Sequence, residues 1–325
     1  MTDRTANSTV PKSGANGIIS RVGAWLSQER VFRWIPFILV EATFLLVIII
    51  PFILTLYISF LRWRANRPFE QAYLSGFRNY EQVLNDPGFW ASLGRTFYFA
   101  GFAVVFELLI GFVLAMLVHQ IVRGRRFYIT LFLIPMMVVP IVVGYNFSMI
   151  YLDSGPLNQL LSPVMHFLGI DPRIRWLSHP TAAQFAIIFC DIWQWTSLTF
   201  LIFLSGFSAL PPQLINAGRV MGASKRQIFF WIELPLLKPA IVIAVVIRSM
   251  EALKMFDPVV LLTFGGPGTS TQTIAYYLWE QVWMFNKYGF GAAASILLLI
   301  LFSVLIFGAI WLLMRQRTDL DGGRT

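Results

Sequence analysis

The sequence predicts an all-α membrane protein with six transmembrane helices and both termini in the cytoplasm. Hydrophobic residues make up 57% of the 325 positions and charged residues only 13%, with a mean hydropathy of +0.68. This balance is far from that of a soluble domain. Six apolar stretches are long enough to cross a hydrocarbon core of roughly 30 Å. Basic residues are concentrated in alternate connecting segments, which sets the orientation.

The six predicted spans lie near residues 36–61, 93–118, 128–151, 181–209, 236–256 and 292–314. The fifth is the least continuous, because Arg248, Glu251 and Lys254 crowd its end. Residues 1–35 are polar and basic, without the compact apolar region and cleavage site of a signal peptide. We expect a cytoplasmic N-terminal tail over 1–35 with an interfacial helix at 18–34, a membrane domain over 36–314 and a cytoplasmic C-terminal tail over 315–325.

Orientation follows from the basic residues. With the N-terminus inside, the inner segments hold the basic tail, the arginine turn at 123–126 and the basic residues of the segment 211–239. Arg62, Arg64 and Arg67 would lie outside and oppose this assignment, but the inner segments hold more basic residues. The positive-inside rule therefore favours both termini in the cytoplasm. The net charge of +9 is then a topology signal, and no basic, aromatic-interleaved domain suggests nucleic-acid binding.

Polar groups within the spans suggest a ligand path. Charges at bilayer depth are costly and usually face a cavity or a partner. Glu41 and Glu107 are isolated in their spans, so we expect each to be neutral or packed against another helix. The run DIWQWTS combines aromatic rings with amide and hydroxyl groups about midway across the fourth span, which suits a neutral, hydroxyl-rich ligand. The alternative is that its tryptophans fill helix contacts.

At the end of the fifth span, Arg248, Glu251 and Lys254 share a helical face. We expect internal ion pairing among them, with substrate contact as the alternative. The residues expected to line a path are Asp191, Trp193, Gln194, Trp195, Glu251, Phe256 and Asp257.

No pattern indicates an enzyme. The single cysteine, Cys190, excludes an intrachain disulfide, and the three histidines lack metal-ligand spacing. The chain has no G-x-x-x-x-G-K-[ST] loop for ATP phosphates and no nucleophile–base arrangement. We therefore expect no catalytic residue, no metal ligand and no cofactor bound by this chain.

The segment 211–239 is a polar interruption with an ordered pattern. Its first half predicts a helix with one apolar face: Leu214, Ala217, Val220 and Met221. Gly222 then separates it from a second short helix, which a capping box at Ser224 and Gln227 begins. Apolar residues at 228, 229 and 232 line one face of that second helix. A helix–glycine–helix hairpin on a membrane protein indicates a docking element.

This hairpin resembles the cytoplasmic EAA loop of permease subunits from binding-protein-dependent ABC importers. Gly222, Ala223, Ser224, Leu234, Pro235 and Pro239 match that pattern. Asn216, Gly218 and Met221 replace its glutamate, second alanine and aspartate. The stretches 76–99, 256–283 and 287–295 resemble the carbohydrate branch, the maltose-type and glycerol-phosphate-type permeases. Together these resemblances cover most of residues 36–314.

The resemblance implies a type I ABC importer permease fold, with a core at about 90–312 and a coupling hairpin at 211–235. It implies a second homologous permease, two ATPase subunits that bind ATP and Mg²⁺, an extracytoplasmic solute-binding protein and a lipid membrane as partners. The implied coupling residues are Asn216, Ala217, Gly218, Arg219, Met221, Gly222, Ala223, Ser224, Lys225, Ile228, Phe229, Leu234 and Pro235. Ile228, Phe229 and Trp231 would supply apolar contact, and neighbouring basic residues would steer docking.

The implied function is import of a sugar or sugar-like solute, namely an oligosaccharide, polyol or glycerol phosphate, across the bacterial cytoplasmic (inner) membrane. Because Asn216 brings no charge, we expect the ATPase to tolerate a neutral contact there, or the apolar residues to carry the coupling. Two other classes stay open: an ion-coupled secondary transporter, and a noncatalytic scaffold or sensor subunit.

Overall fold

The computed structural model describes residues 29–64, 68–167, 169 and 173–321. The chain divides into two compact units, Met1–Tyr57 and Ile58–Thr325. The described part of the first unit is helix α2 (Glu29–Ser59), which runs on into the second unit by two residues. Most of the interfacial helix expected over 18–34 lies outside the described residues. Residues 29–34 are helical and form the first turns of α2.

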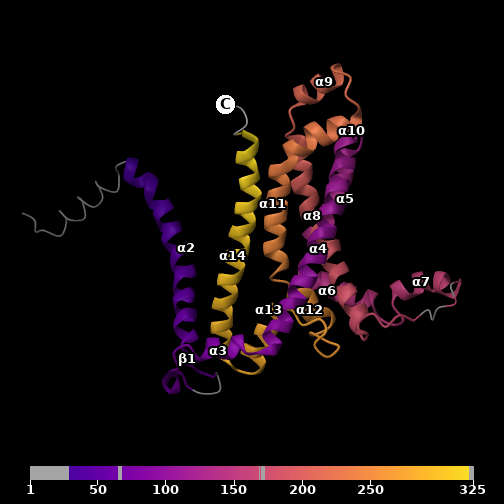
Figure 1. Cartoon of the computed structure of the whole chain (residues 1–325). Coiled ribbons are helices and arrows are strands. Elements are labelled where there is room, and N and C mark those ends of the chain that lie inside the picture. Colours follow the sequence, from indigo (N-terminus) through magenta and orange to yellow (C-terminus); the bar gives the residue numbers. More distant parts are fainter. Residues whose placement is uncertain (1–28, 65–67, 168, 170–172, 322–325) are drawn as a thin grey trace, which may run out of the picture. The chain divides into compact units, whose positions relative to one another are not determined.

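The second unit is a bundle of long helices with short elements at their ends (Figure 1). Its long helices are α4 (Pro87–Gln120), α5 (Arg125–Met137), α6 (Pro140–Ile150), α8 (Pro180–Ser208), α11 (Leu234–Ala252) and α14 (Tyr288–Asp321). The short elements before α8 are β1 (Leu61–Arg62), η1 (Phe69–Gln71), β2 (Tyr73–Leu74), α3 (Arg78–Leu84) and α7 (Pro156–Phe167). Those after it are α9 (Pro212–Val220), α10 (Lys225–Ile228), η2 (Phe229–Glu233), α12 (Asp257–Leu262), α13 (Ile274–Trp279) and η3 (Glu280–Met284). Strands β1 and β2 pair antiparallel.

Five helical stretches in the described residues are long and apolar enough to cross a membrane, and a sixth span exists if α5 and α6 count as one. The third predicted span, 128–151, is broken into α5 and α6, which meet at an angle of 91°. Val138 and Val139 between them are extended, with ψ near +130°. The ring of Pro140 disfavours helical geometry in the residue before it, which explains the break.

The fifth span also differs from its predicted bounds of 236–256. It begins at Lys225, passes through the π-helical turn η2 and ends at Ala252. The second helix of the hairpin is therefore the start of this span rather than a separate short helix. This continuous helical stretch joins the hairpin directly to the membrane bundle.

Helices α4 and α8 form the most extensive helix pair of the bundle. A Cβ atom on Gly111 would lie 2.1 Å from Thr199 Oγ1 and 2.8 Å from the Phe200 nitrogen. Only glycine allows the backbones to approach this closely. Phe200 and Phe203 of α8 pack beside this contact in a buried cluster. The close approach brings the polar residues of α4 and α8 together at mid-helix.

Candidate translocation and coupling sites

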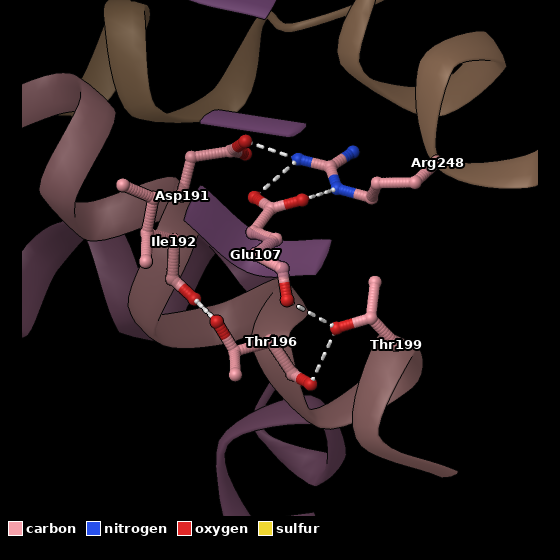
Figure 2. A network of polar contacts seen from close by, with 6 residues as sticks. All are labelled: Glu107, Asp191, Ile192, Thr196, Thr199 and Arg248. Atoms are coloured by element: carbon pink, nitrogen blue, oxygen red, sulfur yellow. Dashed lines mark hydrogen bonds and ion pairs between the residues drawn. The ribbon is translucent and has the colours of Figure 1, made fainter. Parts of the chain in front are cut away.

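Three charged side chains from three helices meet in the interior of the bundle, as Figure 2 shows. Arg248 of α11 donates through Nε to Glu107 Oε2 of α4, and through Nη2 to Glu107 Oε1 at 2.9 Å. The same Nη2 donates to Asp191 Oδ2 of α8. Arg248 is 1% exposed, Glu107 0% and Asp191 5%. We call these three residues the ion cluster.

The ion cluster holds two carboxylates against one guanidinium. A bidentate arginine–carboxylate pair is strong and directional, and buried charges persist only when they are paired. The cluster therefore fixes the middle of α4 and of α8 against the C-terminal part of α11. Two threonines extend the polar contacts: Thr199 Oγ1 donates to the Glu107 carbonyl at 2.8 Å, and Thr196 Oγ1 to the Ile192 carbonyl at 2.6 Å (Figure 2).

This geometry corrects one prediction and decides another. Arg248 pairs across helices with Glu107 and Asp191, and not within its own helix as expected. Lys254 and Glu251 do pair, at 2.8 Å, on the surface. Glu107 was expected to be either neutral or packed against another helix. It packs against α11, through its contacts with Arg248.

The DIWQWTS residues point in different directions. The Trp195 ring lies under the Arg248 guanidinium, whose central carbon is 5.3 Å from the ring centroid. Trp193 instead lines an apolar cavity of about 360 Å³ between α4, α5 and α8, with Thr196 and Ser197. Gln194 Nε2 donates to the Val138 carbonyl at 3.2 Å, at the α5–α6 break. Asp191 and Trp195 therefore belong to the ion cluster region, and Trp193 does not.

The remaining predicted path residues lie elsewhere. Phe256 packs against Tyr276 and Trp279, with ring centroids 6.5 and 6.0 Å apart. Asp257 is exposed at the first position of α12, and Glu251 pairs with Lys254. The seven predicted residues thus do not form one site. Two residues of the ion cluster, Glu107 and Arg248, were not among these seven. The signal for both in the sequence was a charged residue inside an apolar stretch.

The hairpin has the predicted form. Gly222 has φ +82°, a conformation that favours glycine, and turns the chain between α9 and α10. The capping box is present: Gln227 N donates to Ser224 Oγ at 3.3 Å, and Ser224 N to Gln227 Oε1 at 2.8 Å. A Cβ on Gly218 would lie 2.9 Å from Ile232 Cδ1, so a glycine here lets the two arms close. Ile228 is buried within the hairpin and Phe229 lies against Phe112.

The most exposed large apolar residues of the hairpin are Val220, Met221, Phe230 and Trp231, and Leu214 is exposed to a lesser degree. Met221 is 81% exposed and Trp231 80%. Large apolar side chains clustered on a surface mark an interaction site. Of the coupling residues named from sequence, Asn216, Ala217, Arg219, Gly222, Ser224, Lys225 and Pro235 are exposed, whereas Ala223 and Leu234 are half-buried.

A broken-helix bundle with a buried ion cluster and a surface hairpin defines a multi-span membrane transport subunit. The chain belongs to the family described as "Binding-protein-dependent transport system inner membrane component", which matches residues 107–317. It is therefore a permease subunit of an ABC transporter and not an enzyme. This membership sets aside the ion-coupled secondary transporter.

Several characterised or solved proteins are similar to the chain. The trehalose/maltose permease MalF of Thermococcus litoralis is 36% identical over 73% of this chain and 78% of its own length. The sulfoquinovosyl glycerol permease SmoG of Agrobacterium fabrum is 32% identical over 78% of this chain and 80% of its own. In the solved bacterial alginate ABC transporter in complex with its alginate-bound periplasmic protein, one chain has a TM-score of 0.73 at 21% identity, over 88% of this chain and 95% of that one. This last likeness supports the fold.

Proposed function

We propose that the chain is the membrane-spanning subunit of an ATP-driven importer for a sugar or sugar-like solute. With a second homologous permease it forms the translocation path in the bacterial inner membrane, with both termini in the cytoplasm. Two ATPase subunits bind ATP and Mg²⁺, and an extracytoplasmic binding protein delivers the solute. The names of the similar permeases, for trehalose/maltose and sulfoquinovosyl glycerol, support the carbohydrate class.

The observation that carries the coupling role is the exposure of large apolar side chains on the hairpin and on η2, which follows α10: Val220, Met221, Phe230 and Trp231. Because α10, η2 and α11 are continuous, a force on the hairpin reaches Arg248 through one helix. A movement of α11 then acts on the ion cluster, which joins α4 and α8. Closure of the ATPase pair would in this way bias the bundle between two states.

The proposed substrate path runs beside the ion cluster. Arg248 uses Nε and Nη2 for its carboxylate partners, and Nη1 donates to no other described residue. Nη1 and the adjacent Trp195 ring therefore offer a hydrogen-bond donor and a stacking face. This combination suits the hydroxyls and the apolar face of a sugar ring.

A matched pair of substitutions tests the coupling. Gly222→Val places a β-branched residue at φ +82°, whereas Gly222→Asn keeps a residue that tolerates this conformation. In the reconstituted complex we expect ATPase stimulation by loaded binding protein to fall for Gly222→Val and to persist for Gly222→Asn. Unchanged stimulation in both would contradict the coupling role and favour a scaffold or sensor subunit. Thermal-shift screening of the cognate binding protein against sugars and polyols tests the substrate class.

A further inference from the structure

A polar hollow is lined by residues in or next to β1, α3 and the first turn of α14. These elements lie at the end of the bundle opposite the hairpin (Figure 1). Its volume is about 300 Å³. Three cations line it, Arg62, Arg64 and Lys287, together with a single carboxylate, Asp86. We call this hollow the cationic pocket. The proposed function assigns it no role.

Among the described residues, no ion pair neutralises the positive charge of the pocket. No carboxylate of the described residues lies within 4.0 Å of Arg62, Arg64 or Lys287. Asp86 is occupied elsewhere: its Oδ2 accepts from the Tyr277 hydroxyl at 2.7 Å and its Oδ1 from the Gly88 nitrogen at 2.7 Å. Burial, followed by the hydrogen bond to Asp86, raises the pKa of the Tyr277 hydroxyl, which therefore remains a donor. The pocket presents an unmatched excess of cations.

The frame of the pocket is rigid. Asn79 Nδ2 donates to the carbonyls of Ser59 at 2.8 Å and Leu61 at 2.9 Å, which fixes the chain that enters β1. A Cβ on Gly289 would lie 2.1 Å from the Leu61 oxygen, so α14 begins in direct backbone contact with this segment. The Trp63 and Tyr288 rings are in contact at an interplanar angle of 35°, with centroids 4.9 Å apart. These contacts hold the residues around Trp63 beside Lys287.

Lys287 is itself oriented. Its Nζ donates to Gln281 Oε1 at 2.9 Å and lies 5.7 Å from the Phe290 ring centroid. An ammonium has three donors, so two remain for a ligand. Arg62 and Arg64 are exposed, and both line the pocket with Trp63.

The pocket lies next to the ends of two apolar stretches, and this position points to the class of ligand. Arg62 follows the apolar stretch that ends at Ser59, and Lys287 directly precedes the stretch that begins at Tyr288. Trp63 and Tyr288 are the amphipathic aromatics that favour the membrane–water interface. The pocket therefore lies at the depth of the lipid phosphates. At this depth Arg and Lys side chains meet lipid phosphates, with which they form charge-assisted hydrogen bonds.

We infer that the cationic pocket binds the phosphate of an anionic phospholipid, in the leaflet on the side opposite the hairpin. Arg62 and Arg64 would donate to the phosphate oxygens, and Lys287 would add a third charged donor. The Trp63–Tyr288 pair would lie along the glycerol and upper acyl region. A lipid held here would fasten the β1 segment and the start of α14 to the bilayer surface.

Native mass spectrometry of the full chain in detergent tests this inference, with phosphatidylglycerol and phosphatidylcholine as probes. We expect selective retention of phosphatidylglycerol. Arg62→Gln with Arg64→Gln should weaken that retention roughly 25-fold, at about fivefold for each cation. The control removes the same charge outside the pocket, by Arg78→Gln with Arg175→Gln, both exposed. Arg62→Lys with Arg64→Lys keeps the charge and should retain most of the binding, which separates lipid binding from folding.

Four outcomes would overturn the inference. Equal retention of the two lipids, or equal loss in the control, would show no lipid selectivity at this pocket. Displacement of phosphatidylglycerol by the same concentration of inorganic phosphate would indicate a free-anion site. If Arg62→Gln with Arg64→Gln left lipid retention unchanged but weakened docking of the binding protein, the pocket would instead bind an acidic protein partner. Because lipid retention requires neither transport nor ATP hydrolysis, this test is independent of the proposed function.

Discussion

Arg248 on α11 donates to both carboxylate oxygens of Glu107 on α4, although 141 positions separate the two residues in the sequence. Asp191 on α8 completes the contact. A guanidinium shared by two carboxylates joins three spans of the bundle at one point. The consequences of removing each member differ, and this difference makes the arrangement testable.

Arg248→Met leaves two carboxylates facing each other without a counter-charge, so we expect a loss of about 3 kcal/mol or more in stability. Glu107→Gln leaves Arg248 paired with Asp191, and its cost should be smaller, roughly 1–2 kcal/mol. Thermal unfolding of the purified chain in detergent measures both. Lys254→Met, which breaks only the exposed pair with Glu251, should cost under about 0.5 kcal/mol. A greater loss for Glu107→Gln than for Arg248→Met would contradict this account.

The close approach of α4 and α8 gives a second prediction. Gly111→Ala should lower the unfolding temperature, because its Cβ would lie 2.1 Å from Thr199 Oγ1 and the helices would have to separate. Gly101 lies on the same helix with nothing within 4 Å of its Cβ position, so Gly101→Ala should leave stability unchanged or raise it by up to about 1 kcal/mol. Equal behaviour of the two variants would show that the α4–α8 contact does not depend on Gly111.

The exposed hairpin residues should act on partner binding and not on folding. Met221→Ala with Trp231→Ala removes two side chains that are more than three-quarters exposed, so thermal stability of the isolated chain should hold. Co-purification with the ATPase subunit should fall on the order of tenfold, as for apolar anchors at interfaces. Phe167→Ala on α7, 89% exposed at the opposite end, is the control and should keep full co-purification. An undiminished complex with the double variant would refute docking through this patch.

Two neighbouring tryptophans separate the substrate path from the apolar cavity. Trp195 lies against Arg248, whereas Trp193 lines the cavity between α4, α5 and α8. Trp195→Leu should raise the KM for uptake on the order of fivefold, because the guanidinium loses its aromatic support. Trp193→Leu keeps an apolar lining and should leave the KM unchanged. Uptake in proteoliposomes at matched protein levels provides the comparison, and a larger effect of Trp193→Leu would place the path in the cavity.

Local sequence patterns predicted the features that depend on local chemistry. Five of the six apolar stretches are long helices that overlap their predicted positions. The Gly222 turn and the Ser224–Gln227 capping box are present as expected, because both depend on a few adjacent residues. The prediction of a third span over 128–151 did not include its break, although Pro140 stands within it. Hydropathy carries no information about the direction of the backbone. The ring of Pro140 changes that direction, because it disfavours helical geometry in the residue before it.

What the sequence by itself determined is the class of chain: a polytopic membrane bundle with an ordered polar hairpin, since length, apolarity and turn chemistry are local properties. Only the tertiary structure decided which charges meet. Glu107, Asp191 and Arg248 lie in three separate helices, and no periodicity relates them. Their pairing depends on how closely α4 and α8 approach at Gly111 and on which face α11 presents. The free energy of burying each of these charges depends on partners that are distant in sequence. Only the folded bundle brings those partners together.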